Sequence, residues 1–323
     1  MQRSKRAIVR NPVIKHGYQI SFLIFCSCIS ACAESTREQV GLDVRTPKVL
    51  VIGIDGIRPD VLMDVNTPNI DKLAAEGFLS NHALTGYPSV SGPGWSSMLN
   101  GVWPDKHGVT DNSCEGERYN DFPDFLTRIE QIQPELETFA VTDWAPLGHS
   151  DQGSPPISDA VDVKLVLDGY ELGWAEADAK SIQLAVEQLE NSNPDALFVY
   201  LGNPDEISHE HSSIGSEYRD AIALADEHVG ILVQALHNRP TYSDEDWLIL
   251  SSTDHGRRSD GGHGGDSEEE RTIYFLANGP SVVTTTLPDS TFIVDIAVTA
   301  LTHLKIQIDP SWQLDGKPVG ILR

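Results

Sequence analysis

Residues 48–55 read KVLVIGID, an apolar run that ends in a carboxylate. A strand whose two faces are both buried shows such a continuous run, whereas a strand with one solvent-exposed face alternates between apolar and polar residues. Four further runs of this kind follow at residues 138–143, 196–202, 246–254 and 272–279. The sequence therefore predicts a sheet that is covered on both faces.

Amphipathic segments separate these predicted strands. The clearest helical patterns lie at residues 67–77, 174–190, 216–237 and 292–304. In the first of them, Thr67 and Pro68 have the composition of a helix start. Alternating strands and helices predict a single α/β domain over residues 47–323, a three-layer α/β/α sandwich with a mostly parallel central sheet.

The first 31 residues differ from the rest in composition. They contain five of the 23 Lys and Arg residues and no acid, and the basic part precedes a short apolar run, ISFLIFCSCISA. This order predicts a secretory signal peptide in residues 1–31. Cys32 resembles the lipidated cysteine of a bacterial lipobox, although Ala31-Cys32-Ala33 also fits ordinary signal cleavage. Residues 32–46 would form a flexible tether.

These segments and the overall charge bound the partners and the location. Without residues 1–31, 18 basic residues face 48 acidic ones, a formal charge of −30. Such a chain offers no basic groove for nucleic acid, and an anionic small molecule would need bound cations to reverse the local field. We expect an exported protein, held on the periplasmic face of a bacterial membrane only through a lipid on Cys32, or otherwise soluble in the periplasm or secreted. No protein partner follows from the sequence.

Carboxylates and histidines gather where three predicted strands end. In chain order they are Asp55, Asp205, His209, Asp254, His255 and His263, the last three within TDHGRRSDGGHGG (253–265). Ligands bind at the carboxyl ends of parallel strands, so these side chains are expected to meet. Three carboxylates and three imidazoles supply three ligands for each of two metal ions, and mixed oxygen and nitrogen ligands favour Zn²⁺. We therefore expect two Zn²⁺ per chain.

Ser91 is the candidate nucleophile. The stretch SGPGWSSMLNG (91–101) predicts a helix that begins near Ser91, with Pro93 in its first turn. A helix N-terminus favours oxyanions. Paired metal ions clamp the attacking and leaving oxygens of an in-line displacement, and three carboxylates with one serine alkoxide balance two Zn²⁺. The pattern indicates hydrolysis at phosphorus.

As an ordered set, GIDGIRPD, SGPGWSSMLNGVWPDKHGV, DEISH, TDHG and GGHGG resemble the alkaline phosphatase superfamily, in particular its type I phosphodiesterase and nucleotide pyrophosphatase branch. The resemblance implies one zinc ion held by Asp55, Ser91, Asp254 and His255, and another held by Asp205, His209 and His263. It also implies that Asn112 donates a hydrogen bond to a non-bridging phosphoryl oxygen, with the Gly92 N–H as a second donor. The implied substrates are phosphodiesters or nucleotide pyrophosphates, cleaved through a phosphoseryl intermediate.

The chain departs from that branch in two places. Residues 92–95 read Gly-Pro-Gly-Trp where the branch has Phe-Pro-Asn-His, and His263 follows His255 by eight positions where the branch has a long insertion. Trp95 and Trp144 could stack on a substrate ring or simply pack in the core. The enzyme alternatives are a phosphomonoesterase, or a sulfatase or phosphonate hydrolase on the same core. The alternative without activity is a catalytically silent binding lipoprotein.

Overall fold

A computed structural model describes residues 45–150, 153–283 and 290–321. The predicted signal peptide, Cys32 and nearly all of the predicted tether lie outside these residues. Within the three described ranges, no helix combines the length and the apolar character that crossing a membrane requires.

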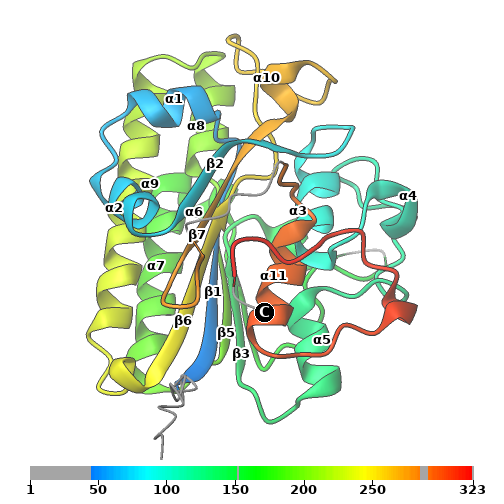
Figure 1. Cartoon of the computed structure of the whole chain (residues 1–323). Coiled ribbons are helices and arrows are strands. Elements are labelled where there is room, and N and C mark those ends of the chain that lie inside the picture. The colour runs from blue at the N-terminus through cyan, green and yellow to red at the C-terminus, as the bar shows by residue number, and fades with distance from the viewer. Residues whose placement is uncertain (1–44, 151–152, 284–289, 322–323) are drawn as a thin grey trace, which may run out of the picture. The chain divides into compact units, whose positions relative to one another are not determined.

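A seven-stranded sheet forms the middle layer of the fold (Figure 1). The strand order is β2-β7-β6-β1-β5-β3-β4, and the paired strands are parallel except where β7 meets β6 and β2. The strands are β1 (Thr46–Ile54), β2 (Phe78–Leu84), β3 (Thr138–Thr142), β4 (Val163–Val166), β5 (Ala196–Leu201), β6 (Glu245–Ser252) and β7 (Thr272–Asn278). The mostly parallel sheet is as predicted.

All five predicted strands are present, as β1, β3, β5, β6 and β7. The two strands that the sequence pattern did not predict, β2 and β4, form the two edges of the sheet. Their side chains are largely half-buried, so neither strand has a continuous buried apolar run. A search for such runs finds strands that are covered on both faces and misses edge strands.

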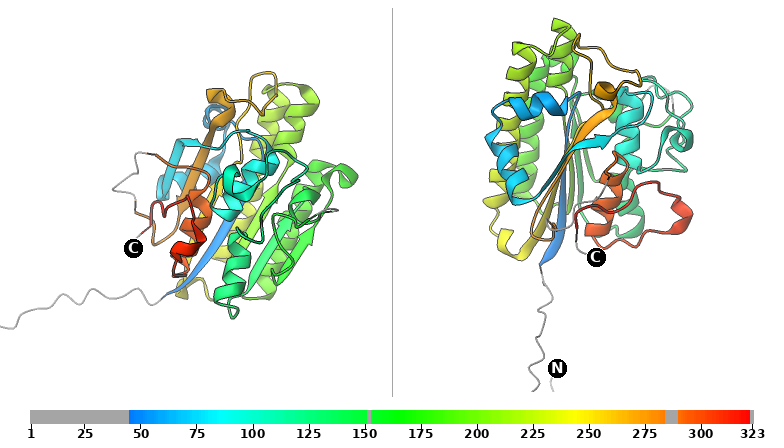
Figure 2. Two further views of the ribbon diagram at one scale, coloured as in Figure 1. Left: turned by 90° about the vertical axis from the view of Figure 1, so that its right-hand side faces the viewer. Right: turned by 45° about the horizontal axis from the view of Figure 1, so that its top comes forward.

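Helices cover both faces of the sheet (Figures 1 and 2). On one face α1, α2, α7 and α9 bury Leu50 and Ile52 of β1, and on the other α3, α5 and α11 bury Val49 and Val51. Alternate residues of one strand thus enter separate cores, which confirms the α/β/α sandwich. The α-helices are α1 (Pro59–Asp64), α2 (Pro68–Glu76), α3 (Ser91–Asn100), α4 (Pro104–His107), α5 (Phe125–Ile132), α6 (Gly169–Leu172), α7 (Trp174–Asn191), α8 (Asn203–His211), α9 (Ser216–His237), α10 (Glu268–Arg271) and α11 (Asp295–His303). Three 3-10 turns are η1 (Ala145–Leu147), η2 (Tyr242–Asp244) and η3 (Pro310–Trp312).

The helix predicted to begin near Ser91 is α3, and the four clearest predicted helices correspond to α2, α7, α9 and α11. The last of them begins at Asp295, three residues later than predicted. Asp295 Oδ2 accepts the Phe292 N–H over 2.9 Å, which holds the preceding residues in a turn. Polar side chains that bond the local backbone favour such turns over helix.

The three central strands end at the same level. Gly53 of β1 pairs with Ser252 of β6 on one side and with Tyr200 of β5 on the other. Residues that follow these strands therefore emerge side by side at one edge of the sheet. That edge carries the candidate site.

Candidate metal centre

Short connections at the carboxyl ends of β1, β5 and β6 carry the predicted ligands. Asp55 directly follows β1, and α8, which begins just after β5, carries Asp205 and His209 on one face. Asp254 and His255 follow β6. The structure brings these side chains, His263 and Ser91 into one region.

Asp55, Asp254 and His255 form the first three-donor group. Their ligand atoms lie within 4.8 Å of one another, and His255 Nε2 lies 3.6 Å from Asp55 Oδ1 and 3.3 Å from Asp254 Oδ2. All three side chains are buried, and these two carboxylate oxygens have no hydrogen-bond partner among the residues described. Two unpartnered carboxylate oxygens facing one imidazole nitrogen fit a cation such as Zn²⁺.

Two aromatic side chains orient Asp55. The Tyr200 hydroxyl donates to Asp55 Oδ2 over 2.6 Å, and the Trp95 Nε1–H donates to the same oxygen over 3.0 Å. Trp95 is completely buried and packs edge-on against Tyr200, with ring centroids 5.0 Å apart. Trp95 therefore orients a site carboxylate and is not available to stack on a substrate, whereas Trp144 lines the site cavity.

Backbone groups orient the other two members of this group. The Gly56 N–H donates to Asp254 Oδ1 over 3.3 Å, which leaves Oδ2 as the free oxygen. His255 Nδ1 lies 2.9 Å from the Gly256 carbonyl, so Nδ1 carries the proton and Nε2 keeps its lone pair. Such outer contacts fix the ligand atoms of metal-binding histidines and carboxylates.

Ser91 is the first residue of α3 and contacts the first group. Its Oγ lies 3.4 Å from His255 Nε2. The start of α3 also packs tightly on Asp254, because a Cβ atom at Gly94 would lie 2.9 Å from the Asp254 Cβ. The glycine at position 94, one of the departures from the branch pattern, thus permits this close approach.

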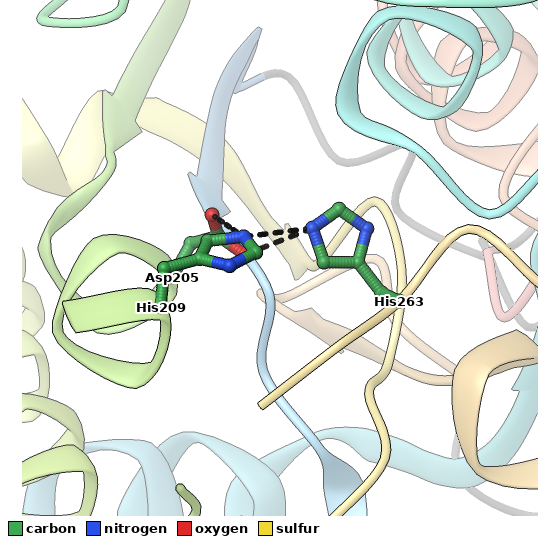
Figure 3. Close-up of side chains that lie close together, drawn as sticks. All are labelled: Asp205, His209 and His263. Carbon is green, nitrogen blue, oxygen red and sulfur yellow. Dashed lines mark hydrogen bonds and ion pairs between the residues drawn. The ribbon is translucent and has the colours of Figure 1, made fainter. Parts of the chain in front are cut away.

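Asp205, His209 and His263 form the second three-donor group (Figure 3). Asp205 Oδ2 lies 3.2 Å from His209 Nε2, and the Nε2 atoms of the two histidines are 2.9 Å apart. His263 Nδ1 lies 3.0 Å from the Ser89 carbonyl, so its Nδ1–H donates there and its Nε2 lone pair faces His209. Two imidazole nitrogens and a carboxylate oxygen that converge in this way fit a second Zn²⁺.

The two groups adjoin each other. The rings of His255 and His263 stack with centroids 3.8 Å apart, and Asp205 Oδ1 lies 3.9 Å from His255 Nε2. Both groups face a cavity of ≈ 240 Å³ that Ser91 and Asn112 also line. Six of the eight predicted site residues line this cavity. Asp254 and His255 do not line it, but His255 Nε2 lies 3.6 Å from Asp55 Oδ1 and 3.4 Å from Ser91 Oγ.

Asn112 lies at the rim of this cavity and is exposed. Its Oδ1 accepts the Gly92 N–H over 2.7 Å. In this structure the Gly92 N–H donates to Asn112, and its role as a second donor to the substrate stays a prediction. The amide NH₂ group of Asn112 is the donor that remains.

The three carboxyl groups of the site differ in pKa. Burial, with the charge of Asp205 adding to it, raises the pKa of Asp55 to about 7. Burial and the charge of Asp55 raise the pKa of Asp254 well above its usual range. The charged forms of both acids therefore lack compensation by positive charge within the described chain.

Arg257 is a site residue that the sequence did not single out. Its guanidinium is fully buried, forms an ion pair with Asp205 Oδ1, and donates to the Gly56 carbonyl over 2.9 Å. Burial acts against ionisation of Asp205, but the charge of Arg257, the hydrogen bond with His209 and the charges of His255 and His263 together outweigh it, so the pKa of Asp205 is lowered. The adjacent Arg258 is 47% exposed, and no pattern in GRRSD tells which arginine turns inward.

Asp143 also follows a central strand, yet it lies outside both groups. It is buried beside Asp178, and burial together with that neighbour's charge raises its pKa well above the usual range. Asp178 accepts the N–H groups of Gly202 and Asn203 over 2.9 and 3.3 Å. Asp178 thus holds the start of α8, the helix that carries two of the candidate ligands.

Comparisons with known proteins identify the family of this chain. A family model described as type I phosphodiesterase / nucleotide pyrophosphatase matches residues 49–259. Ectonucleotide pyrophosphatase/phosphodiesterase family member 3 of Rattus norvegicus is 23% identical over 236 residues, which cover 70% of this chain and 26% of that protein. Family member 7 of Mus musculus is 25% identical over 237 residues, 66% of this chain and 50% of that protein. The chain thus spans about a quarter to a half of these relatives.

Solved structures share the fold. A 2-O GAG sulfatase superposes with a TM-score of 0.66 at 15% identity, over 84% of this chain and 73% of that chain. Murine ectonucleotide pyrophosphatase / phosphodiesterase 5, solved as an inactive variant in complex with AMP, gives a TM-score of 0.61 at 14% identity, over 82% and 96% of the two chains. These likenesses confirm the alkaline phosphatase-like fold. Because the family model matches more than half of the chain, this protein belongs to the type I phosphodiesterase / nucleotide pyrophosphatase family.

Proposed function

We propose that the protein is a two-zinc hydrolase of phosphodiesters or nucleotide pyrophosphates that reacts through a phosphoseryl intermediate on Ser91. The observation that carries this proposal is the shared cavity of ≈ 240 Å³, where two three-donor groups meet a serine at a helix N-terminus. Membership of the family supports the hydrolysis of phosphate esters.

The donor set fits two zinc ions. Asp55, Asp254 and His255, with Ser91, would hold one ion through the two carboxylate oxygens that have no hydrogen-bond partner, His255 Nε2 and Ser91 Oγ. The second group, Asp205, His209 and His263, would hold the other. When bound, Zn²⁺ at these positions would supply Lewis acidity, which lowers the pKa of an adjacent hydroxyl and stabilises charge on phosphoryl oxygens.

The proposed reaction has two successive displacements at phosphorus. Ser91 Oγ bonds to phosphorus while the bond from phosphorus to the leaving ester oxygen breaks. The dipole of α3 favours negative charge on Oγ, and the Asn112 amide donates to a non-bridging oxygen. In this first displacement the Ser91 proton goes to the leaving ester oxygen. In the second displacement a water oxygen bonds to phosphorus, the bond from phosphorus to Oγ breaks, and one proton of that water passes to Oγ.

Export and a lipid anchor on Cys32 complete the proposal. The support is the order of basic and apolar residues before Cys32. Mass analysis of the mature N-terminus decides between the two cleavage modes, because a diacylated cysteine and an unmodified terminus differ in mass. An N-terminus that still begins at Met1 would contradict export by either route.

Removal of the Ser91 hydroxyl should abolish turnover without emptying the site. For Ser91→Ala we expect bis(p-nitrophenyl) phosphate hydrolysis to fall by at least ~10³-fold. Zinc content, measured by elemental analysis, should stay near two ions per chain because six side-chain donors remain. Ser216→Ala, an exposed serine of α9, is the control. Unchanged turnover in Ser91→Ala would exclude the covalent mechanism.

The wild-type protein tests the alternative without activity. If it contains fewer than two zinc ions per chain and added zinc does not activate it, the chain is better explained as a catalytically silent binding protein.

A panel of p-nitrophenyl esters separates the proposed activity from its enzyme alternatives. We expect kcat/KM for a phosphodiester to exceed that for the monophosphate, the phosphonate and the sulfate by at least about tenfold. All of these esters have the same leaving group, p-nitrophenolate. Differences in kcat/KM therefore reflect how well the enzyme accepts the phosphoryl, phosphonyl or sulfuryl group that is attacked. Preference for the monophosphate or the sulfate would replace the proposal by the corresponding alternative.

Metal-free protein should lose stability as the pH rises from about 4 to about 7. The pKa of Asp55 is about 7 in the folded protein and 3.8 in the unfolded chain, so between these values only the folded state binds the proton. The free energy of unfolding therefore falls with rising pH. Denaturant titrations in chelator measure this fall, which Asp55→Asn should reduce and Zn²⁺ should reverse. Stability that rises over this window in chelator would contradict the burial of an uncompensated acid.

A further inference from the structure

Two larger cavities adjoin the central cavity that contains Ser91. The first, here the Asn112 cavity, has ≈ 600 Å³, is lined by residues 112–117 and by parts of 145–150 and 153–156, and shares Asn112 with the central cavity. The second, here the His209 cavity, has ≈ 580 Å³ and shares Glu206 and His209 with it. A phosphodiester has two substituents, so one cavity is available for each.

Both flanking cavities are acidic. Glu115 and Glu117 line the Asn112 cavity, and Glu176, Glu206 and Glu210 line the His209 cavity. Among the described residues that line the three cavities there is no lysine or arginine. An anionic substituent in either cavity would therefore meet like charge, with no lysine or arginine among the described lining residues to offset it.

The contacts of two of these acids keep them at the cavities. Glu206 Oε1 accepts the Tyr170 hydroxyl over 2.9 Å, and Tyr170 also lines the central cavity. Glu117 accepts the N–H groups of Tyr119 and Ser154 over 2.7 and 2.9 Å. Neutral donors position these carboxylates without supplying a full positive charge.

Arg257 does not offset the negative charge that the two substituents of the substrate would meet in the flanking cavities. Its charge is paired with Asp205 beneath the site, and its side chain is fully buried. Three carboxylates and a Ser91 alkoxide would offset two Zn²⁺, so the metal ions and their ligands, taken together with Arg257, would carry one positive charge in excess. That excess matches the single negative charge of a phosphodiester.

We propose that the substrates are phosphodiesters in which the phosphoryl group carries the only negative charge, with both substituents uncharged or cationic. This inference rests on the proposed function and narrows it: nucleotide pyrophosphates, which carry further phosphate charge, become poor substrates. Repulsion from positioned carboxylates excludes such ligands, which is a common basis of specificity.

Three p-nitrophenyl phosphodiesters of matched size test the charge rule. Their second substituents are 2-(trimethylammonio)ethyl, 3,3-dimethylbutyl and 2-sulfonatoethyl, so the added charge is positive, zero or negative. With the zinc-loaded protein at low salt, kcat/KM for the sulfonate should be roughly tenfold or more below that for the neutral ester, and the cationic ester should equal or exceed the neutral one. The differences should shrink in high salt. A sulfonate ester as good as the neutral ester would overturn the proposal.

Replacing one cavity glutamate by glutamine shows which cavity causes the discrimination against the sulfonate ester. Glu206→Gln should improve the sulfonate ester relative to the neutral ester by several-fold, because it removes one carboxylate and keeps an acceptor for the Tyr170 hydroxyl. Glu187→Gln, an exposed acid of α7 outside the three cavities, should leave the ratio unchanged. If Glu117→Gln changes the ratio and Glu206→Gln does not, the second substituent lies in the Asn112 cavity, and the charge rule still holds. If neither changes it, the cavity acids do not set specificity and the proposal fails.

Binding distinguishes a failure of this rule from a failure of the proposed function. Calorimetric titration of zinc-loaded Ser91→Ala with the three esters should give a Kd for the sulfonate at least roughly tenfold above that for the neutral ester. If no ester is turned over by the wild type but this order of binding holds, the proposed hydrolysis is wrong and the charge rule stands. Equal binding of all three esters overturns the charge rule, whatever the turnover.

Discussion

The burial of three carboxylates at the ends of three adjacent parallel strands is the constraint on which the site depends. Asp55, Asp205 and Asp254 are each almost completely buried, and among the lysines and arginines of the described chain only Arg257 forms an ion pair with one of them. Moving an unpaired carboxylate out of water costs several kcal/mol, so such a cluster is stable in its charged form only with cations. The outer oxygens of Asp55 and Asp254 are bonded to protein donors, while the inner oxygens converge without a partner.

The loop after β6 joins the two halves of the site. Within TDHGRRSDGGHGG it supplies Asp254 and His255 to one group, Arg257 to the carboxylate of the other, and His263 to the second group. Its return path runs against α8: a Cβ atom at Gly261, where φ is +77°, would lie 2.6 Å from the Ser208 carbonyl. The glycines therefore allow the loop to pass closely over the helix that holds Asp205 and His209.

The sequence was sufficient for those features that depend on one-dimensional pattern. Central strands show continuous apolar runs, and the acids and histidines that follow them identify the ligand edge, because parallel strands end together. Edge strands such as β2 and β4 lack that pattern. The inward turn of Arg257 and the contact of Tyr200 with Asp55 depend on side chains from different segments, which no spacing along the chain records. The Gly92 N–H, which the sequence assigned to the substrate, donates to Asn112 in this structure.

The central claim is that two cations occupy this site, one in each three-donor group. The most direct measurement is a crystal structure of zinc-loaded protein with anomalous difference maps recorded on both sides of the zinc absorption edge. We predict two peaks per chain, one among Asp55, Asp254, His255 and Ser91 and one among Asp205, His209 and His263, about 4 Å apart as in two-metal sites. A single peak, or peaks away from these side chains, would contradict the account.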